Sequence, residues 1–296
     1  MITALTISLL LTVTVSNSVC FSLTKHNNSQ EQLLNGCSDE KDNALNTPGN
    51  RYFIKISNYS YFENLSYNFG NNQTNSTCGY VALAMLLSYY DNCLNDSIVE
   101  NGYEVSGSGT QSNGTLHEPD NNSLSFNPDS VSAYYTFLRS YKNTSLHAYL
   151  ILKDKDALFN NPPVNYMAST YKAEFGTNEY DLQVLAQSYL YDIGVNQYCN
   201  IVYNESYGTS YTMDDIVYEI IDEIDSNRPV LCGFKNHARI VYGYQIDYSG
   251  CVKFYCHNGY INQNSIEVVA PSENSLPNAF PGGVGYVSLH FSFPSN

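Results

Sequence analysis

The chain has 296 residues and carries 13 basic against 28 acidic side chains, a formal charge of -15. This excess of negative charge repels phosphate backbones and anionic membrane surfaces, so the composition argues against nucleic-acid binding. A length of 296 residues is enough for one large domain or for two small lobes that share a cleft. Hydrophobic residues make up 43% of the chain, so a substantial core can form.

The chain opens with an apolar segment. Residues 2–19 have about the length of a signal-peptide core and are short for a membrane span. We therefore expect residues 1–21 to be a signal peptide, and the protein to be secreted or at the cell surface, with no membrane contact once the peptide is removed. Residues 22–50 are polar and are expected to form a linker or pro-segment before a domain over residues 51–296.

Hydrophobic periodicity and turn residues predict the elements of this domain. Its N-terminal part is expected to be mainly helical and its C-terminal third rich in strands, which indicates an α+β fold. The predicted elements, in chain order, are a strand over residues 52–56, a loop over 59–76, a helix over 81–90 opened by Cys78 and ended at Asp91, a loop over 102–127, helices over 130–141, 180–193 and 214–225, and strands over 230–234, 238–244, 252–256 and 282–293.

The most informative stretch is Thr77-Cys78-Gly79-Tyr80, at the start of the first long apolar run. Free N–H groups and the positive end of a helix dipole favour the thiolate, which is the form of cysteine that attacks carbonyl groups. Cys78 is therefore a candidate nucleophile. The alternative is that it is a packed core cysteine with no chemical role.

The cysteines show no pattern of a metal site. They have no Cys-x-x-Cys pair and no histidine pair at the spacing of a structural zinc site, so we expect neither a metal nor another cofactor. Loss of Cys20 with the signal peptide would leave seven, an odd number that is consistent with at least one free thiol. The eight cysteines are at positions 20, 37, 78, 93, 199, 232, 251 and 256.

A thiol nucleophile needs a basic partner, and His237 is the best candidate among the six histidines. It stands at the entry to a predicted strand, where a histidine can also be a simple polar end cap. A second strand ends about twenty residues later in His257-Asn258-Gly259. Either His257 or Asn258 could accept the proton of the second ring nitrogen of His237 and orient the ring, although Asn258-Gly259 is also an ordinary turn sequence.

These residues carry a family resemblance. Thr77-Cys78-Gly79-Tyr80 and the apolar run up to Asp91 resemble the nucleophile helix of bacterial papain-like cysteine peptidases, in the branch near streptopain and the bacteriocin-processing peptidases. Arg228-Pro229-Val230 followed by residues 236–244 resembles the histidine strand of that branch. The resemblance covers residues 70–260. Its motifs around Cys78 and His237 are the more specific ones.

The resemblance implies a papain-like fold, in which a helical lobe with the nucleophile helix packs against a β-rich lobe. It implies a secreted cysteine peptidase with a peptide or protein substrate in the cleft. Cys78 is expected to attack as a thiolate, and His237 to stabilise that thiolate as an imidazolium and then to protonate the leaving amine. Gln73 is the implied oxyanion donor, with Asn72 as its rival. Matching Gly259 to the glycine of the family's Gly-Trp pair places His257 in the orienting position, while Asn258 is the commoner residue type for that role.

The chain also departs from the family pattern. Asn236 stands where relatives commonly have glycine, Arg239 interrupts an apolar strand, and Tyr260 replaces a tryptophan. These departures motivate a second hypothesis, a catalytically silent papain-like module that binds at surfaces. Acyl transfer or deamidation on the same fold would use the same residues.

Overall fold

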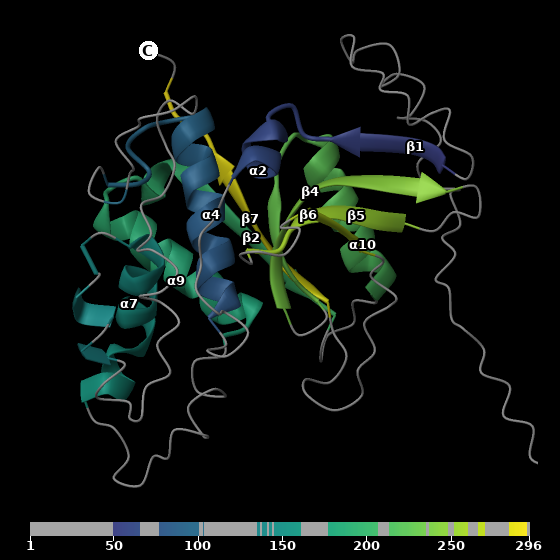
Figure 1. Ribbon diagram of the computed structural model, residues 1–296. Coiled ribbons are helices and arrows are strands. Elements are labelled where there is room, and N and C mark those ends of the chain that lie inside the picture. The colour runs from purple at the N-terminus through teal and green to yellow at the C-terminus, as the bar shows by residue number, and fades with distance from the viewer. Residues whose placement is uncertain are drawn as a thin grey trace, which may run out of the picture.

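The computed structural model describes the chain from Asn50 onward, with gaps (Figure 1). The expected signal peptide and the expected linker or pro-segment, apart from residue 50, lie outside the described residues. The described residues are 50–65, 77–100, 103, 135–136, 138–140, 142–143, 145–160, 177–206, 213–234, 237–247, 252–259, 266–269 and 284–294.

The described strands form one antiparallel sheet of seven strands in the order β2-β7-β3-β4-β5-β6, with β1 also paired to β4. β4 is the longest strand and connects three partners, because its first half pairs with β3, its second half with β1, and its other edge with β5. The strands are β1 (Asn50–Lys55), β2 (Cys199–Glu205), β3 (Val230–Phe234), β4 (His237–Asp247), β5 (Val252–His257), β6 (Ile266–Val269) and β7 (Gly285–Phe291).

Helices lie on both sides of the sheet. Figure 1 shows α4, α7 and α9 grouped to the left of the strands, while α10 lies behind them to the right. α4 packs on β3 and β4, α9 on β2 and β7, and α10 on β1, β3, β4 and β7. The helices are α2 (Ser60–Asn64), α4 (Cys78–Cys93), α7 (Leu146–Asn160), α9 (Glu179–Asp192) and α10 (Met213–Asp225), with a 3₁₀ turn η4 (Asn196–Tyr198).

The structure confirms an α+β fold and most of the predicted elements. Their ends are shifted by a few residues. The predicted elements that form are the helix opened by Cys78, the helices near residues 180–193 and 214–225, and the strands near 52–56, 230–234, 238–244, 252–256 and 282–293. The predicted loop over residues 59–76 is wrong at its start, where α2 forms. The loop over 102–127 lies almost wholly outside the described residues, and so does much of the helix over 130–141. Sequence reasoning missed α7, β2 and β6.

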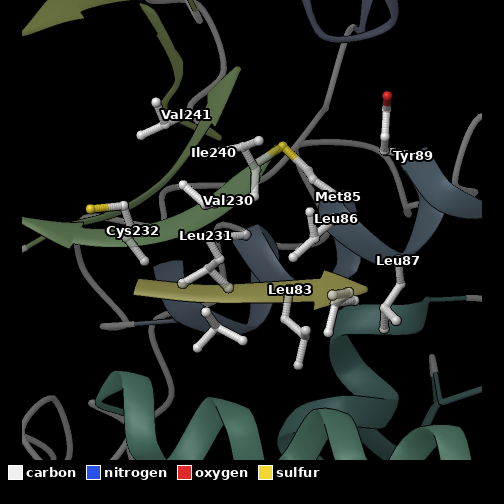
Figure 2. Close-up of a cluster of buried hydrophobic side chains, with 14 of the residues drawn as sticks. Leu83, Met85, Leu86, Leu87, Tyr89, Val230, Leu231, Cys232, Ile240 and Val241 are labelled. Carbon is white, nitrogen blue, oxygen red and sulfur yellow. The ribbon is translucent and has the colours of Figure 1, made fainter. Parts of the chain in front are cut away.

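α4 is the central helix because it is apolar on nearly every side. All its residues from Gly79 to Asp91 are buried, as expected for a helix enclosed by other elements rather than lying on a surface. Figure 2 shows Met85 and Leu86 of this helix beside Ile240, Val230 and Leu231 of the sheet. This packing holds the middle of α4 against β3 and β4.

The predicted end of this helix at Asp91 is two residues too early, because α4 continues to Cys93. The buried carboxylate of Asp91 accepts the backbone N–H groups of Ile98 and Val99, at 3.0 and 2.8 Å. Asp91 therefore holds the chain as it leaves the helix. A carboxylate in this role satisfies two N–H groups that burial would otherwise leave without partners.

Candidate active site

Cys78 is the first residue of α4, and its sulfur lies where the helix meets the start of β4. The backbone N–H groups of Ala238 and Gly79 act on the sulfur, and the charge of Arg239 lies near it. Each of these favours a negative sulfur, but burial outweighs them and raises the pKa of the thiol. Thr77, the residue before the helix, forms no side-chain cap.

His237 is the first residue of β4 and precedes Ala238, whose backbone N–H lies near enough to the Cys78 sulfur to favour its negative form. The buried ring forms a hydrogen bond from Nε2 to the backbone carbonyl oxygen of Asn258, at 2.6 Å. A carbonyl oxygen can only accept, so Nε2 carries the proton and Nδ1 is the basic nitrogen of the neutral ring. This tautomer is the one required of a ring that receives a proton from a thiol through Nδ1.

Within the described residues, the thiol of Cys78 does not hydrogen bond to the ring of His237. Ala238 brings them close instead, since it follows His237 directly and its backbone N–H lies near the sulfur. Catalytic hydrogen bonds are often long before substrate binds. The structure thus brings Cys78 and His237 close together without a hydrogen bond between their side chains.

His257 does not act on His237. Its Nε2 donates to the carbonyl oxygen of Leu65 at 3.1 Å, and its Nδ1 accepts the N–H of Gly259 at 3.1 Å. Both ring nitrogens are therefore used in holding the chain before α4 to the end of β5. The preference for His257 as the orienting group is not supported by this geometry, which favours Asn258.

The group of Asn258 that bonds to the ring of His237 is its backbone carbonyl oxygen. Gly259, which follows it, has a φ of 71° and lies against Val81 of α4, where a Cβ would come within 2.9 Å of Cγ1. Only glycine fits both this conformation and this contact. The turn after β5 is thereby pressed against the nucleophile helix, which sets where the Asn258 carbonyl points.

Burial disfavours the charged forms of both central groups. The pKa of His237 is lowered to about 4 by burial, with the nearby charge of Arg239 acting in the same direction. Since the pKa of Cys78 is raised, the pair at neutral pH consists of a thiol and a neutral imidazole. This differs from the thiolate and imidazolium that the family resemblance suggests.

Arg239 is a part of the site whose role the sequence did not indicate. Its buried side chain donates from Nη1 to the carbonyl oxygen of His237 at 2.9 Å, and so fixes the backbone of the histidine. The sequence signal that could have indicated this role is the position of Arg239, a charged residue in an apolar strand two residues after His237.

The candidate oxyanion donors Gln73 and Asn72 lie outside the described residues, as do Asn236 and Tyr260.

No helix in the described part of the chain is long and apolar enough to cross a membrane. Among the same residues, no three His, Cys, Asp or Glu side chains are grouped so that they could hold a metal ion. No family model matches this chain, and no curated protein matches it.

Proposed function

We propose that this protein is a papain-like cysteine peptidase, secreted or held at the cell surface, that hydrolyses peptide bonds with Cys78 as nucleophile and His237 as proton partner. The observation that carries the proposal is the junction of α4 and β4. There a thiol at a helix N-terminus lies near the backbone N–H of Ala238, directly beside a histidine whose Nε2 is bonded to the Asn258 carbonyl. A packed core cysteine needs no such neighbour.

The chemistry follows from a neutral pair. The sulfur of Cys78 attacks the peptide carbonyl carbon while its proton passes to Nδ1 of His237, and the imidazolium that forms is stabilised by the Asn258 carbonyl. His237 then gives the proton to the leaving amine as the C–N bond breaks. Water, deprotonated by the same nitrogen, hydrolyses the thioester and restores the thiol.

Charge develops on the carbonyl oxygen during the attack and requires donors. The N-terminus of α4 supplies backbone N–H groups, which bring positive potential without any rearrangement. Gln73 is the proposed side-chain donor, as the family resemblance implies. Arg239 holds the backbone of His237 and adds a positive potential near the sulfur.

Brief treatment of the folded, reduced protein with iodoacetamide tests this proposal, with labelling sites identified by mass spectrometry. Cys93 is the matched control, since it ends the same helix, is partly exposed, and has a pKa raised by burial to about 11. We expect Cys78 to label faster than Cys93, and the difference to disappear in His237→Ala. A peptide-cleavage assay with Cys78→Ala and Cys93→Ser then attributes any cleavage to one thiol.

The alternative proposal is a catalytically silent module with the same fold, favoured by the burial that keeps both groups neutral. It predicts that Cys78 labels no faster than Cys93 and that His237→Ala changes nothing. Cleavage that Cys78→Ala abolishes and Cys93→Ser leaves intact would exclude it.

A further inference from the structure

A row of small residues crosses the sheet beside the nucleophile. Register pairs Ala238 of β4 with Gly233 of β3, Gly233 with Gly285 of β7, and Gly285 with Glu205 of β2. Residues paired in this way lie on one face of a sheet. With neighbouring strands about 4.8 Å apart, the row extends roughly 14 Å from the residue that contacts the Cys78 sulfur to the carboxylate of Glu205.

Glu179, the first residue of α9, lies directly over this row. Its carboxyl group occupies the place of the missing Cβ at Gly233 and lies 3.1 Å from that place at Gly285. Thr177 and Leu182, on either side of Glu179 in the chain, pack in the same way on Gly79. The N-terminal turn of α9 therefore stands next to that of α4, and the Glu179 carboxyl lies about one to two strand spacings, roughly 5–10 Å, from Ala238.

This carboxyl group has no positive partner in the part of the chain that the structure describes. The residue is partly buried, its own backbone N–H is the donor that acts on the carboxyl group, and the nearby Glu205 repels its charge. Burial and this repulsion raise its pKa. Arg239 does not neutralise the Glu179 carboxylate. Neighbouring residues of a strand project from opposite faces of the sheet, so Arg239 lies on the face opposite to that of Ala238 and Glu179. A buried carboxylate in this state is stabilised by any cation that reaches it.

Aromatic rings adjoin the same place. Tyr180, which follows Glu179, has 55% of its surface exposed and packs edge-on against Tyr203 of β2. The hydroxyl of Tyr203 lies close to the carboxylate of Glu205. A basic side chain has an aliphatic stem and a charged end, and tyrosine rings beside a carboxylate suit both parts.

We infer that Glu179, supported by Glu205 and Tyr180, forms a subsite that binds a positively charged group of the substrate, the side chain of a lysine or arginine within about three residues of the bond that Cys78 attacks. An extended peptide advances about 3.3 Å per residue, so three residues span about 10 Å, which matches the distance from Ala238 to the Glu179 carboxyl. The inference rests on the proposed function for the role of Cys78. The net charge of -15 adds a general attraction for basic peptides.

Protection of Cys78 from iodoacetamide tests the subsite without requiring cleavage. Four peptides of one sequence are compared, with lysine or ε-acetyl-lysine at the tested position and with a free or acetylated N-terminus. We expect the lysine peptides to protect Cys78 at concentrations at least fivefold lower than the acetyl-lysine peptides. Protection that depends only on the free N-terminus would still assign a cation site but identify the terminal ammonium as its ligand.

The variants Glu179→Gln and Asp181→Asn form a matched pair, because both remove one charge from the first turn of α9. We expect the preference for lysine to disappear in the first and to persist in the second. If Glu179→Gln does not fold, the salt dependence of the preference in the wild type is the substitute, and the preference must shrink as ionic strength rises. Equal protection by all four peptides, or a lysine preference retained in folded Glu179→Gln, would overturn the subsite.

These outcomes separate the two proposals. A protein that binds lysine peptides through Glu179 but cleaves none of them keeps the subsite and loses the peptidase. A protein that cleaves peptides irrespective of lysine keeps the peptidase and loses the subsite.

Discussion

At the scale of single residues, the least expected feature is that a backbone carbonyl orients His237. Sequence reasoning compared two side chains, His257 and Asn258, because side chains are what a sequence displays. The carbonyl belongs to every residue type and carries no signal of its own. What fixes it is the conformation of Gly259 against Val81, a contact between segments far apart in the chain.

This geometry predicts different outcomes for two neighbouring substitutions. Asn258→Ala keeps the backbone carbonyl, so we expect its Cys78 labelling rate to stay within about threefold of the wild type. His257→Ala removes a buried ring with bonds to Leu65 and Gly259, and we expect it to lower the free energy of unfolding by about 2–4 kcal/mol. Urea denaturation and timed labelling measure the two effects. A Cys78 labelling rate at least tenfold lower in Asn258→Ala would show that its side chain, not its carbonyl, orients the ring.

The neutral pair predicts a particular pH profile. The pKa of Cys78 is raised by burial and that of His237 is lowered to about 4. In His237→Ala the rate of Cys78 alkylation should therefore rise with pH through the alkaline range, above the ordinary thiol pKa, with no plateau between pH 5 and 8. A plateau in that range in this variant would mean that the thiolate forms without His237.

At the scale of elements, the sequence predicts the helices and strands whose apolar residues repeat regularly, and it fails where the pattern is mixed. α10 is clear because its apolar residues recur at helical spacing with acids on the other face. β2 is missed because its sequence, Cys-Asn-Ile-Val-Tyr-Asn-Glu, does not alternate clearly between apolar and polar residues, in keeping with a strand in which no residue is fully buried. The approach of α9 to α4 has no local signal at all, since it depends on Gly79.

Gly79 provides a direct test of that approach. A Cβ here would collide with Cγ2 of Thr177 and lie 3.1 Å from Leu182. We expect Gly79→Ala to lower the free energy of unfolding by about 1–3 kcal/mol and to slow Cys78 labelling, because α9 is displaced from the start of α4. Thr177→Ser removes the colliding methyl group, so the double variant should recover at least half of the loss. No recovery would mean that the cost comes from the helix backbone and not from this contact.

At the scale of the whole molecule, the site is made by one junction between segments from all parts of the described chain. α4 provides the thiol, β4 the imidazole, β5 the carbonyl and α9 the carboxyl group over the glycine row. The sequence supplies the residue types and their order. It cannot supply the burial, which decides the charge of each group, because burial depends on all of these segments together.

Burial of two histidines makes the fold sensitive to acid. His237 and His257 both have pKa values lowered to about 4, below the ordinary value of 6.5. The unfolded chain therefore binds protons first as pH falls, so the stability is complete above about pH 6.5 and is lost progressively down to pH 4. A shift of about 2.5 pH units corresponds to roughly 3 kcal/mol for each histidine.

His257→Gln tests this contribution because glutamine can accept and donate hydrogen bonds as the ring does, yet it does not take up a proton. Between pH 6.5 and 4 we expect the free energy of unfolding of this variant to fall less than that of the wild type, by roughly 3 kcal/mol. Urea denaturation across this range gives the comparison. Glu179 contributes with the opposite sign, since its raised pKa favours folding at low pH, but it is present in both proteins and cancels in the difference. An acid dependence that is the same in the variant and the wild type would mean that His257 titrates normally and is not held neutral by the fold.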